Sequence, residues 1–364
     1  MKPTPCMVLT MAVLLAGQAQ AAPKYRVEIL PPLPDRWVTF DSYDMNDHGE
    51  VLGRGNSGPV IYSQGSYRPV DALDPSKVGG VWLTAMNNKR DIALTLNDGA
   101  SDRERPYVLK DGQLIDITPE GAANRPFFPG MVKDINESAQ VVGYYGGKTF
   151  FYDGQRSRFV DVGASENADV LAWGLNDAGV IVGNINDPAG RSGGFIYDHG
   201  QVTYLDRLMP RDINNADQVL GGIRQSIFRP VRTVIRDSDG SLRTLDGFYG
   251  SDLNDRGWVA GYRDGDTGGF EAQLFRGGRV HDLADLLVHA PQGVRLQAAL
   301  EINDSGQVFG YGWKQGLGRI SYIATPVPEL ESQALLLCGL GLVGTVTWRR
   351  RRGHGRRDIQ PSRA

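Results

Sequence analysis

The sequence predicts an all-β fold, a seven-bladed β-propeller of four-stranded blades closed by the N-terminal strand, and two observations carry this prediction. A ten-residue pattern recurs seven times without gaps, and each copy is followed by two further apolar runs that flank a turn. Four short strands in about 43 residues are the unit of a propeller blade. Hydrophobic residues make up 41% and charged residues 22% of the 364 residues, which is an ordinary globular composition.

Each copy places an aliphatic residue or methionine before an asparagine, and valine or isoleucine five residues after it. The copies are DMNDHGEVLG (44–53), AMNNKRDIAL (85–94), DINESAQVVG (134–143), GLNDAGVIVG (174–183), DINNADQVLG (212–221), DLNDRGWVAG (252–261) and EINDSGQVFG (301–310). In the fourth unit we expect strands at 172–175, 180–184, 194–197 and 202–205. Asn, Asp and Gly between the paired runs supply the backbone conformations that tight hairpins need.

The seven repeated asparagines allow two interpretations. They could form a ring of ligands, or each side chain could cap a backbone N–H of its own turn. A residue that recurs in every unit, whatever the neighbouring loops contain, favours the structural role. These residues are Asn46, Asn87, Asn136, Asn176, Asn214, Asn254 and Asn303. The glycine that ends six of the copies is expected to allow a bulge or a close backbone approach near the narrow centre.

The two ends of the repeat region provide an independent argument for a closed ring. The seventh unit has a third strand near 319–323 but lacks a fourth strand, whereas the region begins with an unpaired strand at 25–30. Pairing this first strand into the last blade removes two exposed edges. An open solenoid would leave the first strand unexplained.

Both termini differ in composition from the repeats. Residues 1–21 have the early lysine, short apolar core and A-x-A ending of a secretory signal peptide. Residues 326–352 contain a short apolar stretch followed by four arginines, which indicates a membrane span with its cytoplasmic end at the arginines. Residues 353–364 form a basic cytoplasmic tail.

The second of these segments resembles the PEP-CTERM sorting signal of Gram-negative bacteria, although Leu330 replaces its second proline. The matching residues are Pro328, Glu329, Arg349, Arg350, Arg351 and Arg352. The resemblance implies an exosortase-type processing enzyme as a partner. It also implies export across the inner membrane and a location in the membrane, at the cell surface or outside the cell. A plain C-terminal anchor is the alternative.

The repeats at 22–325 are similar to the extracellular repeats of the HAF family. The fit is weaker in the second unit, where Arg90 and Leu94 replace the expected glycines and put its inner hairpin in doubt. This resemblance implies a surface or secreted protein, and it brings no known catalytic residue.

Charge and cysteine content exclude several function classes. The terminal segments hold eight of the 39 Lys and Arg but only two of the 42 Asp and Glu, so residues 22–330 carry a net charge of about −9. Nucleic acid is a poor partner for such a domain, since its binding requires basic surface. The two cysteines, Cys6 and Cys338, lie outside the repeats, which therefore contain no disulfide and no thiolate metal site.

We expect no cofactor, no metal and no enzymatic activity from the motifs. The four histidines of the repeat region are scattered, and no nucleophile-elbow, P-loop or dinucleotide fingerprint is present. Asp237-Ser-Asp239-Gly240 and the stretch at 264–268 resemble the start of a calcium loop but lack its later glutamate, so turn composition explains them equally well. The carboxylate-pair chemistry of glycoside cleavage stays open, because such partners can meet only in the fold.

Loop length indicates where a ligand would bind. The short turns belong to one face of the expected propeller, whereas the long loops and the connections between blades belong to the other. Binding residues concentrate on variable loops over a rigid scaffold. The predicted ligand face carries Arg103, Arg105, Arg125, Phe127, Phe128, His289 and Arg295. The expected function is non-enzymatic binding of an extracellular polysaccharide or a surface protein. The alternatives are a purely structural matrix protein and a polysaccharide-degrading enzyme.

Overall fold

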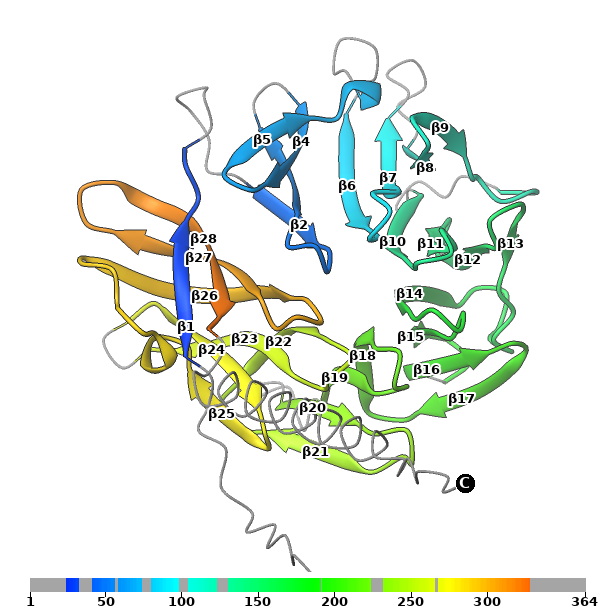
Figure 1. The fold of residues 1–364 in the computed structure, drawn as a ribbon. Coiled ribbons are helices and arrows are strands. Elements are labelled where there is room, and N and C mark those ends of the chain that lie inside the picture. Colours follow the sequence, from blue (N-terminus) through cyan, green and yellow to red (C-terminus); the bar gives the residue numbers. More distant parts are fainter. Residues whose placement is uncertain are drawn as a thin grey trace, which may run out of the picture. The chain divides into compact units, whose positions relative to one another are not determined.

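A computed structural model describes residues 24–32, 41–55, 58–73, 80–97, 104–122, 130–190, 192–223, 232–265 and 268–327. These residues form a β-propeller of seven four-stranded antiparallel sheets arranged around a central axis (Figure 1). The predicted fold class is therefore confirmed. The four strands expected in the fourth repeat are all present, and their ends differ from the prediction by at most three residues.

From the axis outward, blade 1 contains β2 (Asp41–Met45), β3 (Val51–Gly55), β4 (Gly58–Ser63) and β5 (Ser66–Pro69). Blade 2 contains β6 (Val81–Met86), β7 (Ile92–Asn97), β8 (Glu104–Lys110) and β9 (Gln113–Asp116). Blade 3 contains β10 (Met131–Ile135), β11 (Val141–Tyr145), β12 (Lys148–Tyr152) and β13 (Ser157–Phe159). Blade 4 contains β14 (Asp169–Leu175), β15 (Ile181–Asn186), β16 (Ser192–Asp198) and β17 (Gln201–Leu205).

Blade 5 contains β18 (Leu208–Ile213), β19 (Val219–Ile223), β20 (Arg232–Arg236) and β21 (Leu242–Leu245). Blade 6 contains β22 (Tyr249–Leu253), β23 (Val259–Asp264), β24 (Phe270–Arg276) and β25 (Arg279–Asp282). Blade 7 contains β26 (Val294–Ile302), β27 (Val308–Lys314), β28 (Gly318–Pro326) and β1 (Tyr25–Ile29). Short 3₁₀ turns, η1 (Asp71–Leu73) and η2 (Ala284–Leu286), follow blades 1 and 6.

The N-terminal strand completes the last blade, as the sequence predicted. β1 pairs antiparallel with β28, in a register that places Tyr25 opposite Pro326 and Ile29 opposite Tyr322. The first and last strands of the propeller therefore share one sheet, and β1 lies beside β28 in Figure 1. Hydrogen bonds between chain ends close the ring, in addition to packing between blades.

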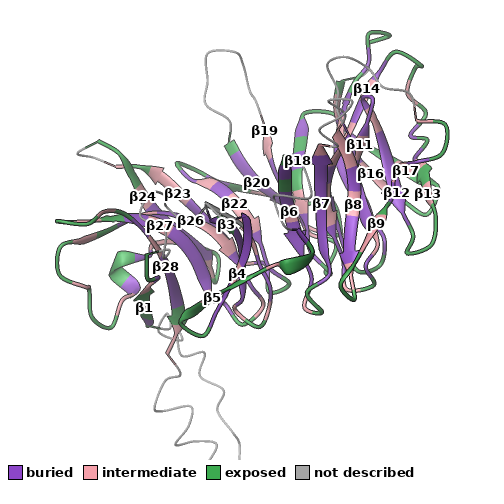
Figure 2. Cartoon of the chain, turned by 90° about the horizontal axis from the view of Figure 1, so that it is seen from above, coloured by how far each residue is buried: buried purple, intermediate pink, exposed green. Residues whose placement is uncertain are grey.

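The antiparallel order gives the propeller two faces. The turns between the first and second strands and between the third and fourth strands lie on one face, which we call the turn face. The loops between the second and third strands and the connections between blades lie on the other, which we call the connection face. Figure 2 shows that buried residues occupy the middle of the blades, whereas exposed residues gather in turns and connections.

The core is a series of apolar layers between adjacent blades. Val141 and Phe150 of blade 3 pack with Ala85 and Val108 of blade 2, and all four side chains are buried. The opposite side of blade 3 packs against blade 4 in the same way. Each sheet therefore buries both of its faces, which explains why the repeats alternate so weakly between apolar and polar residues.

The repeated glycine lies opposite a β-bulge in the first strand, as expected. In blade 7 the register shifts between Ala299 and Glu301, beside the pair formed by Ala299 and Gly310. A Cβ atom on Gly310 would lie 2.0 Å from the carbonyl oxygen of Ala298. The absence of a side chain thus permits the close approach of two backbones.

The inner hairpin of blade 2 keeps the common geometry despite its substitutions. β6 and β7 retain the bulge, between Leu83 and Ala85, and Leu94 is fully buried. Arg90 adopts the left-handed conformation with φ of 65°, and its guanidinium binds the Glu50 carboxylate of blade 1 at 2.8 and 2.9 Å. An ion pair with the neighbouring blade accompanies the unfavourable backbone conformation.

The expected signal peptide, sorting signal and basic tail lie outside the described residues, and so does the expected transmembrane segment. No helix among the residues that the structure describes is both long and apolar enough to cross a membrane.

Candidate functional site

The seven repeated asparagines cap their own turns. Asn46 Oδ1 accepts the backbone N–H groups of His48 and Glu50 at 3.1 and 3.0 Å, and the corresponding bond from the fourth following residue occurs in all seven copies. Each asparagine is about 95% buried. The interpretation that each side chain caps a backbone N–H of its own turn is therefore correct for the Oδ1 atoms.

The Nδ2 atoms have a second role that the sequence analysis missed. Six of the seven asparagines donate a hydrogen bond from Nδ2 to the backbone carbonyl of the equivalent asparagine in the next blade, at 2.9 to 3.3 Å. The exception is Asn46, whose Nδ2 donates to Glu50 within blade 1. The asparagines thus join adjacent blades as well as shaping the turns.

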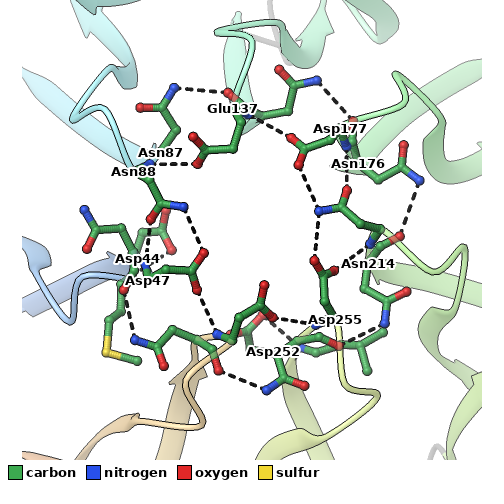
Figure 3. A pocket seen from close by; sticks show the side chains of 18 of the residues that line it. Asp44, Asp47, Asn87, Asn88, Glu137, Asn176, Asp177, Asn214, Asp252 and Asp255 are labelled. Atoms are coloured by element: carbon green, nitrogen blue, oxygen red, sulfur yellow. Dashed lines mark hydrogen bonds between the residues drawn. The ribbon is translucent and has the colours of Figure 1, made fainter. Parts of the chain in front are cut away.

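The residue after each asparagine forms a complete ring around the axis (Figure 3). Its backbone N–H donates to a side-chain oxygen of the equivalent residue in the next blade, and all seven bonds are 2.7 to 2.9 Å long. The ring consists of Asp47, Asn88, Glu137, Asp177, Asn215, Asp255 and Asp304. Only residues with a side-chain acceptor can take this position.

A second set of acidic residues stands two positions before the asparagines. Asp44 accepts the N–H of Met45 at 2.7 Å and the N–H of Met86 in the next blade at 2.6 Å. Asp134, Asp212 and Asp252 make the equivalent pairs of bonds. Burial raises the pKa of Asp44 to about 6 and also raises that of the other three.

The turn face therefore surrounds a polar pocket of about 350 Å³ on the propeller axis. Within the described residues, no group of three or more His, Cys, Asp or Glu side chains is arranged to hold a metal ion. The calcium-like stretch at Asp237 also has another explanation, because that carboxylate binds the Arg243 guanidinium at 2.7 and 2.8 Å. The acidic groups of the turn face accept backbone N–H bonds and hold the ring together.

The connection face has a different composition. It exposes large apolar side chains at the starts of first strands and around the loops between second and third strands. These residues are Trp82, Met209, Phe270, Trp313 and Leu317. They belong to blades 2, 5, 6 and 7, and exposed apolar residues that are scattered singly are normal on a protein surface, so by themselves they define no binding site.

The structure describes three of the seven predicted ligand-face residues. Arg105 in β8 pairs with Asp116 at 3.3 Å, and His289 is exposed in the connection between blades 6 and 7. Arg295 in β26 is exposed, stands opposite Trp313 in the sheet, and lines a pocket. Arg103, Arg125, Phe127 and Phe128 lie outside the described residues. The three described residues do not form one cluster with direct contacts.

The pocket lined by Arg295 lies between blades 6 and 7 and has a volume of about 350 Å³. Its wall includes Phe270, Leu287, Pro291 and Gln297. Phe270, which is 43% exposed, ends a row of three aromatic rings on one face of blade 6. The ring centroids of Tyr249 and Tyr262 are 5.4 Å apart, and those of Tyr262 and Phe270 are 5.0 Å apart.

Two carboxylates also line this pocket and share one arginine. Arg263 Nη2 lies 2.6 Å from Glu271 Oε2 and 3.8 Å from Asp282 Oδ2. Burial raises the pKa of Asp282, with smaller contributions from the neighbouring Asp285 and Glu271. The sequence did not reveal this cluster, because Arg263, Glu271 and Asp282 stand on three strands. Asp282 occupies a position that is also Asp after blades 2 and 3, where Asp116 and Asp161 accept the equivalent backbone N–H bond.

Solved structures of similar fold include the β-propeller domain of the Trilobed protease from Pyrococcus furiosus, with a TM-score of 0.50, 11% identity, and coverage of 80% of this chain and 96% of that one. Porphyromonas gingivalis dipeptidyl peptidase 4 gives a TM-score of 0.48 at 11% identity, with coverage of 78% and 51%. A gluconolactonase from Xanthomonas campestris gives a TM-score of 0.38 at 11% identity, and the match covers 82% of this chain and 98% of that one. No protein-family model matches the sequence, and no curated protein does.

These structures correct one expectation. The sequence motifs led us to expect a protein without enzymatic activity, but a propeller of this fold is a domain of a protease. The lack of a catalytic motif in the repeats is therefore no reason to exclude catalysis. The likeness at 11% identity concerns the fold, and it assigns no activity to this chain.

Proposed function

We propose that this chain is an exported propeller that binds an extracellular polysaccharide on its connection face, at the pocket between blades 6 and 7. The observation that carries the proposal is the row of Tyr249, Tyr262 and Phe270, which leads to a pocket that also contains amide and charged side chains. Aromatic side chains supply a large apolar contact, and a few polar groups orient the ligand. Sugar units present both kinds of surface.

The charge of the domain limits the choice of polymer. A net charge of about −9 over residues 22–330 disfavours nucleic acid and strongly acidic polymers. Two acidic residues line the pocket, Glu271 and Asp282, and both approach the Arg263 guanidinium. A neutral polysaccharide is therefore the favoured ligand, and a surface protein is the second candidate.

Binding can be tested by co-sedimentation of the purified propeller with insoluble polysaccharide from the producing bacterium, alongside cellulose and chitin. Phe270→Ala should weaken binding at least tenfold, since a buried aromatic contact contributes about 1.5 to 3 kcal/mol. Leu242→Ala is the matched control, because Leu242 is 52% exposed on the outer strand of blade 5 and lies near the turn face. Failure of the wild-type protein to bind any of these polymers would favour a purely structural matrix protein.

The cellular location forms a separate part of the proposal. The N-terminal segment would direct export, and the C-terminal segment would retain the propeller at the membrane until an exosortase-type enzyme processes it. Removing residues 326–364 should release a soluble propeller into the medium. Retention of the truncated protein in the membrane fraction would contradict the sorting role.

A further inference from the structure

The pocket between blades 6 and 7 contains groups that binding alone does not require. Glu271 of β24 and Asp282 of β25 both approach Nη2 of Arg263, at 2.6 and 3.8 Å, so one guanidinium nitrogen lies close to both carboxylates. The side chains of Arg263, Glu271 and Asp282 are 42%, 35% and 26% exposed, so a ligand from solvent can reach them. Asp282 is the most enclosed of the three.

The path of a bound chain follows from the strand geometry. Phe270 and Glu271 are the first two residues of β24, and consecutive side chains in a strand point to opposite faces of the sheet. Both residues line the pocket because β24 begins there. A sugar chain that contacts both therefore passes over the end of β24, with one unit beside the Phe270 ring and a glycosidic bond near the carboxylates.

We propose that the chain cleaves the polysaccharide that it binds, with Asp282 as the general acid and Glu271 as the nucleophile of a retaining glycoside hydrolysis. This inference rests on the proposed function. The two oxygens cannot lie farther apart than the sum of their distances to Arg263 Nη2, 2.6 and 3.8 Å, which admits the separation of about 5 Å that retaining enzymes use. Phe270, the ring of the aromatic row that lines the pocket, supplies the substrate contact, and Arg263 positions both carboxylates.

The chemistry is balanced with water as the only co-reactant. Asp282 gives its proton to the glycosidic oxygen while a Glu271 oxygen attacks the anomeric carbon, so that the bond to the leaving sugar breaks and a glycosyl ester forms. Asp282, now ionised, takes a proton from water as the water oxygen attacks the same carbon. The ester bond to Glu271 breaks, and both carboxyl groups return to their initial states. The raised pKa of Asp282 suits the acid role, because its proton is retained to higher pH than usual.

The test uses the full chain with soluble polysaccharide from the producing bacterium, and with carboxymethylcellulose and glycol chitin as defined probes. We expect wild-type protein to release reducing ends. Asp282→Asn should lower the rate at least 100-fold with binding retained, which is the range that a positioned general acid contributes. Glu271→Ala should be inactive, and added azide should restore turnover by replacing the missing nucleophile. A structural role for Glu271 would give no such rescue.

Asp161→Asn is the matched control, since Asp161 occupies the equivalent connection after blade 3 and touches neither carboxylate. It should leave cleavage unchanged. Binding without release of reducing ends by the wild-type chain would overturn the catalytic inference and leave the binding proposal intact. If the wild-type chain neither binds nor cleaves the polysaccharide, both the binding proposal and the catalytic inference are overturned. Equal loss of activity in Asp282→Asn, Glu271→Ala and Asp161→Asn would overturn the roles assigned to the two carboxylates.

Discussion

The two faces of the propeller differ in how far their residues repeat from blade to blade. The turn face repeats one motif seven times. A complete ring of backbone-to-side-chain bonds joins every blade to the next, and six buried asparagines add a second bond between blades. The connection face repeats little, and it exposes Trp82, Phe270 and Trp313. The comparison teaches that repetition in this chain marks the scaffold, whereas the proposed site depends on residues such as Phe270 and Glu271 that the other blades do not repeat.

The comparison predicts that one added methyl group lowers the free energy of unfolding more when it lies near the axis than when it lies at the connection face. Gly310→Ala should lower the free energy of unfolding by about 3 kcal/mol, because its Cβ would collide with the Ala298 carbonyl. Gly316→Ala, in the loop between β27 and β28, should cost about 1 kcal/mol, since φ is +82° but no atom lies within 4 Å. Urea unfolding of both variants measures the difference, and equal costs would contradict it.

The bonds between blades predict the next largest effect. Asn254→Ala removes two caps within blade 6 and the bond from Nδ2 to the Asn303 carbonyl, so the free energy of unfolding should fall by about 2 to 3 kcal/mol. Asn46→Ala removes the same two bonds to Oδ1 and an Nδ2 bond to Glu50 within blade 1, so it should cost a similar amount. A loss of less than about 1 kcal/mol for Asn254→Ala in chemical denaturation would show that its bonds contribute little to stability.

The acidic groups around the axis predict that the propeller is more stable at mildly acidic pH than at neutral pH. Burial raises the folded-state pKa of Asp44 and Asp304 to about 6, above the unfolded value near 3.9. The folded state therefore binds more protons between these values, and stability falls as pH rises from about 4 to 6. Glu50 acts in the opposite sense only below about pH 4, since Arg90 lowers its pKa to about 2.

Thermal unfolding should show this as a melting temperature that is higher at pH 5 than at pH 7.5. The shift should correspond to about 1 kcal/mol, after allowance for solvent screening in the open pocket. Asp44→Asn should reduce the shift. A melting temperature that rises from pH 5 to pH 7.5 would contradict the prediction.

The smallest effect is expected on the connection face. Trp313→Ala should change the free energy of unfolding by less than about 1 kcal/mol, because the side chain is 52% exposed and fills no core. Chemical denaturation beside Gly310→Ala is the measurement. A cost as large as that of the glycine variant would show that the connection face also belongs to the scaffold.

The sequence predicted the propeller scaffold well, because the patterns that form it are local and recur in the repeats. The asparagine turn, the glycine opposite a bulge and the missing fourth strand of the last unit all follow from spacing. The four aspartates that bridge blades all stand two positions before a repeated asparagine, so their positions could be found from the sequence. Their role could not, because the N–H groups that they accept stand 41 to 50 residues away.

The candidate site could be predicted only in part. Loop length pointed to the connection face, and the residues that it selected include Arg295, which lines the pocket of the proposed site. It gave no reason to connect Arg263 with Glu271 and Asp282, because their contacts arise from strand pairing in a single blade and leave no pattern in the sequence. Arg105 was selected for the long loop next to it, and the structure adds a pairing with Asp116 that the loop length did not predict.

The pairing of β1 with β28 also determines how the propeller would carry mechanical load. Tyr25 and Pro326 are opposite each other at the turn face, so both ends of the chain leave the propeller from the same edge of blade 7. A pull on either strand end would act along that strand, and five residue pairs, from Tyr25 with Pro326 to Ile29 with Tyr322, would resist it together in shear.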